Sequence, residues 1–124
     1  MQISDRLDHL CTQLAGCRTA AFGDLGTRLV YRVAGQDRCG QEVLDAATEA
    51  AAEAFALGAG VPGEAGTDTV IVLTPRDVRI AVRSAAGAEE QDFILCLCDT
   101  AADHAAIAAA AQQALAATQQ EQAA

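Results

Sequence analysis

Two cysteines near the end of the chain have a spacing that could support thiol or metal chemistry. Cys96 and Cys98 are separated by one residue in an apolar stretch that is expected to form a strand over 92–98. Because residues two apart on a strand point to the same face, these thiols could converge on a soft metal or form a disulfide. A zinc site would need two more ligands at matching spacing, and no second Cys pair supplies them. A buried free Cys also behaves as a small apolar side chain, so a purely structural role stays open.

A glycine-rich segment, Gly58-Ala59-Gly60-Val61-Pro62-Gly63, matches the G-x-G-x-x-G spacing of dinucleotide-binding loops. Such a site requires a strand before the glycines and a helix after them, whereas here an expected helix precedes and an expected strand follows. Glu64 and Asp68 would also repel phosphate groups. We therefore interpret this segment as a loop and expect no cofactor.

Residues for acid–base or nucleophilic catalysis are scarce. All eight basic residues are Arg, and without Lys the chain lacks the Lys of a phosphate-binding P-loop, of a Schiff base and of a Ser-Lys pair. Ser4 and Ser84 are the only serines, and His9 and His104 are the only histidines. We expect no catalytic site and no metal site, and therefore a protein that is not an enzyme.

Net charge restricts the partners. The 124 residues carry a formal charge of −9, which repels the phosphates of nucleic acids and the surface of anionic membranes. No apolar run is long enough to span a membrane, and the first ten residues lack the apolar segment of a signal peptide. Five cysteines are an odd number in a chain large enough to form its own core, so we expect reduced thiols and a cytoplasmic protein.

Hydrophobic periodicity predicts three helices and five strands. The first helix begins near Ser4 or Asp5, which could cap it, and ends near Gly16. The other elements are expected at 18–22, 27–34, 41–57 (helix), 69–74, 78–84, 92–98 and 101–118 (helix), with Thr100-x-x-Asp103 resembling a capping box. The order α-β-β-α-β-β-β-α predicts one α/β domain over 1–124, with a mostly antiparallel sheet, a core from about 7 to 118 and a frayed tail at 119–124.

The expected middle helix has two contrasting faces. Its apolar stripe consists of Leu44, Ala47, Ala51 and Phe55. The opposite face carries four acidic residues that lie within about 80° of one another at 100° per residue: Glu42, Asp45, Glu49 and Glu53. Such a face is either solvated or a docking surface for a partner.

The whole pattern resembles the Roadblock (dynein light-chain) family over about residues 7–118. The residues that carry the resemblance are AAFGDLGTRLVYR, the helix EVLDAATEAAAEAFALG, and VIVLTPRDVRIAVR followed by DFILCLCDTAAD. The resemblance implies an α+β fold with a five-stranded antiparallel sheet of order 2-1-5-4-3. The first and last helices would cover one face and the middle helix the other, with the apolar strand 93–98 in the centre.

This strand order also implies a dimer. It makes Thr69, Val70, Ile71, Val72 and Leu73 an edge strand, and an uncharged apolar edge without Pro needs a second chain to cover it. Family members pair their third strands and pack their middle helices antiparallel, as homodimers or with a paralogue. The small side chains that would allow this close approach are Ala46, Ala47, Ala50, Ala51 and Ala54.

Roadblock proteins regulate Ras-like small GTPases, act as motor light chains or form platforms for GTPases. The Lys-free, Ala-rich composition favours a bacterial stand-alone member, and the resemblance implies a homodimeric GTPase regulator or scaffold with the acidic helix face toward the partner. Arg38, Arg76 and Arg79 all stay open as a GTPase-activating Arg. The alternatives are a small thiol or metal-binding protein that uses Cys96 and Cys98, or a self-assembling structural adaptor.

Overall fold

The computed structural model describes residues 2–35, 40–58, 68–84 and 91–123. Its elements in chain order are α1 (Ile3–Gln13), β1 (Cys17–Asp24), β2 (Leu29–Gly35), α2 (Gln41–Gly58), β3 (Thr69–Leu73), β4 (Val78–Arg83), β5 (Asp92–Cys98) and α3 (His104–Ala123). This order confirms the prediction from the sequence. Arg38, Cys39 and the glycine-rich segment from Ala59 onward lie outside the described residues.

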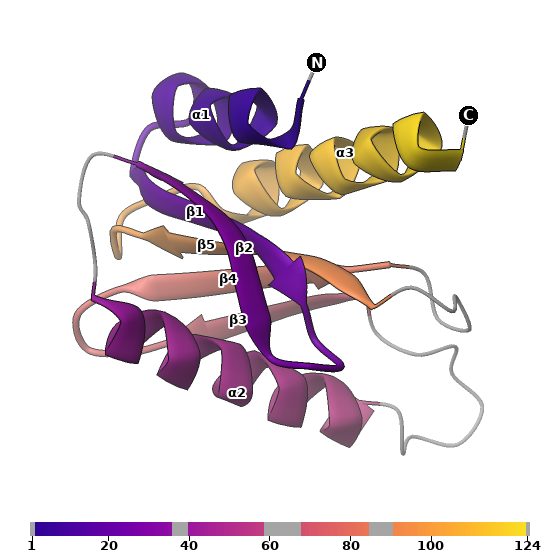
Figure 1. Cartoon of the computed structure of the whole chain (residues 1–124). Helices are drawn as coiled ribbons and strands as arrows, with labels where there is room; N and C mark the ends of the chain where they lie inside the picture. Colours follow the sequence, from indigo (N-terminus) through magenta and orange to yellow (C-terminus); the bar gives the residue numbers. More distant parts are fainter. Residues whose placement is uncertain (1, 36–39, 59–67, 85–90, 124) are drawn as a thin grey trace.

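The five strands form one antiparallel sheet in the order β2-β1-β5-β4-β3, as the resemblance implied. Figure 1 shows α1 and α3 over one face of this sheet and α2 across the other. β5 has a strand on each side and helices over both faces, and every residue from Phe93 to Cys98 is buried. The most continuously apolar strand is thus in the centre of the sheet.

Alternation along the strands divides the core into two clusters. The even-numbered side chains of β4 and β5 pack beneath α1 and α3, together with Leu7, Leu10, Ile107 and Leu115. The odd-numbered apolar side chains of the same strands pack against Leu44, Ala47, Ala51 and Phe55 of α2. The apolar stripe predicted for the middle helix is therefore the face that docks on the sheet. None of the helices in the described part of the chain is long and apolar enough to cross a membrane.

The helix ends differ from the sequence predictions. Gln2 occupies the N-cap position of α1 without a side-chain hydrogen bond, so neither Ser4 nor Asp5 caps this helix. Asp103 Oδ1 accepts a hydrogen bond from the Ala106 N–H at 3.2 Å, which makes Asp103 the N-cap of α3 rather than the N3 residue of a capping box that begins at Thr100.

The last helix does not end at residue 118, where the sequence predicted its end. α3 continues to Ala123, whereas residues 119–124 were expected to fray. Gln, Glu and Ala are good helix formers, and Glu121 forms an ion pair with Arg6 of α1. Intrinsic propensity and this interhelical contact together extend the helix.

The first hairpin is longer than predicted. β1 continues through Asp24, and the turn covers 25–28 instead of 23–26. Asp24 Oδ1 accepts a hydrogen bond from the Gly26 N–H at 2.8 Å, and Arg28 adopts a φ of 62°. A bulge follows Phe22, where a Cβ on Gly23 would lie 2.1 Å from the Leu29 carbonyl oxygen. Only glycine fits this position of the hairpin.

Candidate interaction surface

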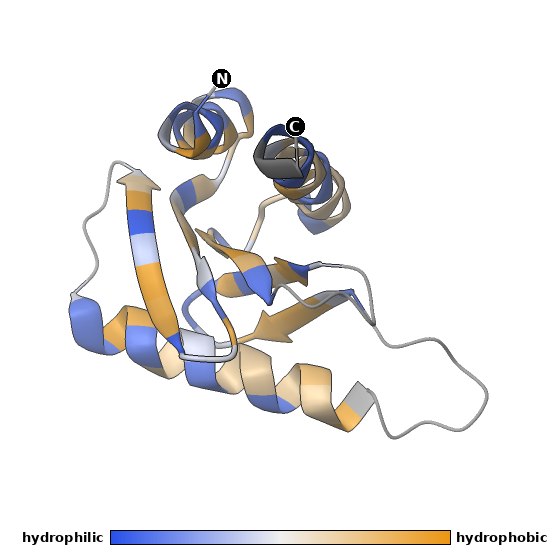
Figure 2. Ribbon diagram, turned by 45° about the vertical axis from the view of Figure 1, so that its right-hand side comes forward, coloured by the Kyte–Doolittle hydropathy of each residue, from blue (hydrophilic) through white to orange (hydrophobic). Residues whose placement is uncertain are grey.

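The surface of α2 is divided into three stripes along the helix. Leu44, Thr48 and Phe55 face the sheet and are buried. Hydrophilic and apolar residues alternate along the ribbon of α2 (Figure 2). At 100° per residue, five apolar residues lie within about 80° of one another outside the buried stripe, and we call them the α2 apolar strip: Val43, Ala46, Ala50, Ala54 and Leu57.

Two of the five alanines predicted for a dimer contact lie on the wrong face. Ala47 and Ala51 are each only 2% exposed, because both pack against this chain's own sheet. Neither is free to contact a second chain. Ala46 is exposed, and Ala50 and Ala54 are half-buried, so these three stay candidates for such a contact.

The α2 apolar strip ends in large side chains that the fold leaves uncovered. Val43 is 40% exposed and Leu57 is 80% exposed, at opposite ends of the helix. Between them the strip carries only alanine, so a partner could approach the helix backbone closely along its middle. This is a flat, apolar surface with one larger side chain at each end.

β3 is a terminal strand of the sheet, and its side chains are only partly used by the fold. Val70 packs against the cluster beneath α2, and Thr69 Oγ1 accepts a hydrogen bond from Gln112 Nε2 of α3 at 2.9 Å. Ile71 and Leu73 are 40% and 71% exposed, and Val72 is half-buried. The β3 edge therefore presents apolar side chains next to backbone groups that no strand in the described part of the chain pairs.

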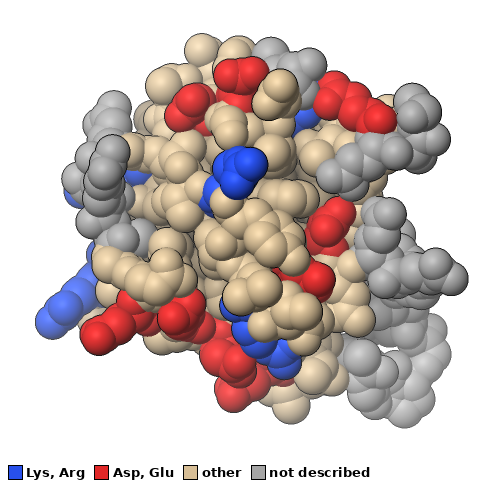
Figure 3. Space-filling model, in the orientation of Figure 1, with Lys and Arg blue, Asp and Glu red and all other residues tan. Residues whose placement is uncertain are grey.

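The acidic face borders the α2 apolar strip and does not cover it. Its four residues, all exposed, are Glu42, Asp45, Glu49 and Glu53. In the space-filling view, Asp and Glu side chains gather along the lower left, over α2 (Figure 3). Glu49 Oε1 lies 3.2 Å from Arg28 Nε, and Asp45 Oδ1 accepts a hydrogen bond from Gln41 Nε2 at 2.8 Å. The face remains strongly negative despite these contacts.

Two of the three arginines considered as GTPase-activating residues are described. Arg79 Nε lies 3.2 Å from Asp77 Oδ1, and its side chain is only 24% exposed. Arg76 is exposed in the turn between β3 and β4. Of these two, Arg76 alone projects into solvent at the same end of β3 as Leu73.

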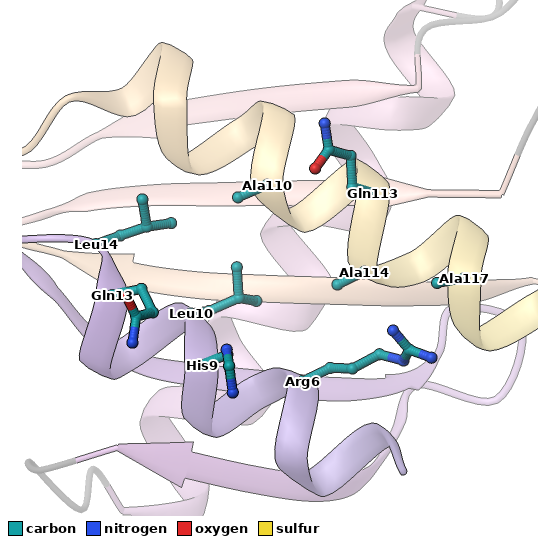
Figure 4. Close-up of a pocket in the computed structure, with 9 residues that line it drawn as sticks. All are labelled: Arg6, His9, Leu10, Gln13, Leu14, Ala110, Gln113, Ala114 and Ala117. Carbon is teal, nitrogen blue, oxygen red and sulfur yellow. The ribbon is translucent and has the colours of Figure 1, made fainter. Parts of the chain in front are cut away.

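A groove between α1 and α3 was not predicted. It has a volume of about 400 Å³, and its walls come from Leu10 and Leu14 on one side and the small side chains of Ala110, Ala114 and Ala117 on the other. His9 and Arg6 lie along its α1 side (Figure 4). The sequence signal for this groove was the row of alanines at i, i+4 and i+7 on one face of α3, because such small side chains leave space between α3 and α1.

The structure brings together four of the five cysteines. Cys96 and Cys98 lie in the buried cluster beneath α1 and α3, as their shared face predicted, together with Cys17 of β1. Cys11 of α1 packs against the same cluster and is half-buried. All four are free thiols. Among the residues that the structure describes, no group of three or more His, Cys, Asp or Glu side chains is arranged to hold a metal ion.

The few residues suited to catalysis are far apart or used by the fold. Ser84 donates its hydroxyl to the Asp92 carbonyl oxygen at 3.3 Å and accepts a hydrogen bond from Gln119. His9 lies on α1, and His104 begins α3. Within the described ranges these residues form no shared site, which leaves the exposed surface of α2 and β3 as the candidate functional region.

Comparison with solved structures agrees with this architecture. The structure of a Roadblock/LC7 domain from Streptomyces avermitilis is similar at a TM-score of 0.76 and 16% identity, with 100% of both chains covered. An MglB with a tetrameric arrangement gives a TM-score of 0.74 at 17% identity, covering 95% of this chain and 85% of that one. Gliding protein MglB from Thermus thermophilus gives 0.69 at 16% identity, covering 95% and 89%.

The similarity is structural and spans the whole chain. No family model matches the sequence, and no match among curated proteins reaches significance. The chain has the Roadblock/LC7 fold, with its helices and strands in the order that the sequence predicted.

Proposed function

We propose that this chain is a non-enzymatic, homodimeric regulator or scaffold of a Ras-like small GTPase in the cytoplasm, where it modulates the nucleotide state or the localisation of the GTPase. The observation that carries the proposal is the Roadblock fold over the full chain, together with an apolar surface on α2 and β3 bordered by acidic residues. Roadblock proteins act by binding GTPases and other partners, and the described residues of this chain supply no catalytic set.

Self-association is proposed through the β3 edge and the α2 apolar strip. α2 packs against β3 on the side of Val70, whereas Ile71 and Leu73 point to the opposite face of the sheet, so the two apolar surfaces lie on either side of the same edge (Figure 1). Two copies related by a twofold axis would pair their β3 strands and pack their α2 helices through Ala46, Ala50 and Ala54. The pairing would satisfy the backbone groups of the edge and bury Ile71 and Leu73. A paralogue with a matching edge is the alternative partner.

The acidic face is proposed to meet the GTPase. In a dimer built on the α2 apolar strip, the acidic faces of both copies would border the helix pair and form one negative surface. A basic surface on the partner would be attracted to it, which raises the association rate most at low ionic strength. Arg76 is available beside the β3 edge, whereas Arg79 is held by Asp77.

The partner is tested by immobilising the protein and passing over it a lysate of the source organism, once with a GTP analogue and once with GDP. We expect a small GTPase of the Ras-like class to be retained in a nucleotide-dependent manner. Recovery of only this chain or a paralogue in both conditions would remove the GTPase from the proposal and leave an adaptor.

Neutralising the acidic face is expected to slow the binding of that GTPase. The double variant Asp45→Asn, Glu53→Gln removes two charges that are not paired with Arg28 and preserves side-chain size. We expect an association rate roughly 3- to 10-fold lower at low salt and a smaller difference at high salt, measured by surface plasmon resonance. The matched control is Asp8→Asn, an exposed carboxylate on α1. Equal association rates for the double variant and wild type would mean that the GTPase does not bind at the acidic face.

A further inference from the structure

The geometry points to an oxidation site: we propose that a hydroperoxide converts Cys17 and Cys98 into a reversible disulfide that joins β1 to β5. The inference does not depend on the proposed GTPase partner, because it concerns two thiols within the chain's own sheet. It also differs from the pairing that the sequence suggested, in which Cys96 and Cys98 would act together.

The sheet places Cys17 directly opposite Cys98. The two residues are partners in the β1–β5 register. Next to them, the Asp99 N–H donates to the Gly16 carbonyl oxygen at 2.8 Å, while the Cys17 N–H donates to the carbonyl oxygen of Leu14, the C-cap residue of α1, at 3.2 Å. Cys17 and Cys98 therefore occupy a non-hydrogen-bonded position of the antiparallel pair. In a regular antiparallel ladder, Cα atoms at such a position are about 4.5 Å apart, inside the range of disulfide-bonded cysteines. The register of this ladder shifts between Cys17 and Thr19, directly after the pair.

The other two thiols are less suited to this reaction. Cys96 is the partner of Ala20 in the register, so it is a diagonal neighbour of Cys17. A side-chain hydrogen bond with Cys17 and the complete burial of Cys96 raise the pKa of Cys96 well above its usual range, which keeps it as a thiol. Cys11 lies on α1, and its Sγ contacts the Ala34 carbonyl oxygen at 3.6 Å. The hydrogen bond with Cys17 and the burial of Cys11 raise the pKa of Cys11 well above its usual range. Cys11 is thereby kept as an unreactive thiol.

Cys98 is the nucleophile of the pair. A side-chain hydrogen bond with Cys17 lowers the pKa of Cys98, although the burial of Cys98 acts in the opposite direction. A thiolate reacts with peroxides, and a thiol does not do so at a comparable rate. Cys17, which stabilises the Cys98 thiolate, is also the thiol that reacts with oxidised Cys98 to form the disulfide.

Both cysteines border depressions through which a small oxidant can approach. Cys17 lines a polar depression of about 350 Å³ beside Thr12 and Gly16. Cys98 lines a second depression, also of about 350 Å³, beside Arg76 and Asp77. The two depressions share Arg18 and Asp99, which form an ion pair with each other.

The proposed reaction balances with hydrogen peroxide as the oxidant. The Cys98 thiolate attacks one peroxide oxygen, the O–O bond breaks, and hydroxide leaves to take up a proton as water. Cys98 is then a sulfenic acid. The Cys17 sulfur attacks the Cys98 sulfur, the S–O bond breaks, and a second water leaves. Two thiols are oxidised by two electrons and the peroxide is reduced to two waters. A dithiol reductant reverses the reaction.

The experiment treats the purified chain, in a Cys39→Ser background, with a stoichiometric amount of hydrogen peroxide and then counts free thiols. We expect the loss of two thiols per chain, without intermolecular products, and their recovery with dithiothreitol. The disulfide closes a long loop, so the apparent Tm of the oxidised protein is expected to rise by roughly 5 °C or more. Unchanged thiols, or only intermolecular disulfides, would overturn the proposal.

Single variants assign the two partners. Because every basic residue is Arg, trypsin leaves Cys11 with Cys17 in peptide 7–18 and Cys96 with Cys98 in peptide 84–124, so a peptide mass alone is ambiguous. We expect the cross-link between these peptides to disappear in Cys17→Ala and in Cys98→Ala. It should persist in Cys11→Ala and in Cys96→Ala, the latter being an equally buried control. A cross-link that persists in Cys98→Ala but disappears in Cys96→Ala or Cys11→Ala would overturn the assignment.

Discussion

Replacing Ile71 with Asp is expected to convert the chain from a dimer into a monomer at micromolar concentration. Ile71 is the central residue of β3, and 40% of it is exposed on an edge that no strand of the described chain covers. A dimer formed through this edge would bury the new carboxylate without a partner, which costs several kcal/mol. A penalty of about 3 kcal/mol raises the dissociation constant more than 100-fold. Sedimentation equilibrium measures this change directly.

The opposite edge of the sheet provides the control. Val33 of β2 is also β-branched and is 50% exposed, so Val33→Asp makes the same chemical change on the other terminal strand. We expect this variant to stay a dimer. If Val33→Asp is monomeric and Ile71→Asp stays dimeric, the dimer interface is at β2 and not at β3. A wild-type chain that is monomeric at micromolar concentration would exclude the homodimer and favour a paralogue as the partner.

A second variant separates the two parts of the proposed interface. Ala46 is exposed on α2 and lies on the apolar strip, so Ala46→Glu should weaken the dimer without touching the β3 edge. The same change at Ala56, which is exposed on the helix side away from the strip, should leave the dimer intact. If Ile71→Asp dissociates the dimer and Ala46→Glu does not, strand pairing alone holds the two copies together.

Periodicity was sufficient to predict the helices, the strands and their buried faces, because bulky residues mark those faces, whereas the strand order was implied by the resemblance to the Roadblock family. Leu44 and Phe55 lie at a helical spacing that leaves one possible docking face for α2, and both are buried. The uninterrupted apolar run from Phe93 to Cys98 agrees with the central position that the resemblance implied for this strand. Each of these patterns lies within one helix or strand, and each is recognised because large apolar residues differ clearly from the polar residues around them.

The interaction surface was predicted less well because alanine provides no such contrast. α2 carries alanine on several sides, so the sequence did not distinguish Ala47 and Ala51, which pack inward, from Ala46, Ala50 and Ala54. Which alanines face inward depends on how α2 is rotated about its own axis. Phe55 and Leu44 fix this rotation when they pack against the sheet. The acidic residues were assigned correctly to an exposed face because carboxylates are seldom buried unpaired.

The thiol cluster could not be predicted from spacing. Cys96 and Cys98 share a strand, and their common face follows from alternation. The pairing of Cys17 with Cys98 depends on the β1–β5 register, which includes a shift between Cys17 and Thr19. A shift of one residue moves a side chain to the opposite face of the sheet. Long-range register of this kind has no signature in one sequence.

The largest loss of stability is expected from Phe55→Ala. Phe55 is 1% exposed, and it belongs to the same buried cluster as Phe93 and Leu95. The Arg83 guanidinium lies 4.5 Å from the centre of its ring. Truncation leaves a cavity and removes this cation–π contact, and such changes at buried Phe cost about 3–5 kcal/mol. This is a large part of the roughly 5–15 kcal/mol that stabilises a domain.

The expected loss of stability is large because few other side chains anchor α2 on the sheet. Apart from Phe55 and Leu44, its buried stripe is built of small side chains, so α2 itself has no other large side chain near Phe55 that could fill the cavity. Denaturation in urea, followed by far-UV circular dichroism, measures the free energy of unfolding. It is best measured in the Ile71→Asp background, because dimer stability depends on concentration. Leu57→Ala, at a position 80% exposed on the same helix, should change stability by less than about 0.5 kcal/mol. A loss below about 1 kcal/mol for Phe55→Ala would mean that this ring does not anchor α2 on the sheet.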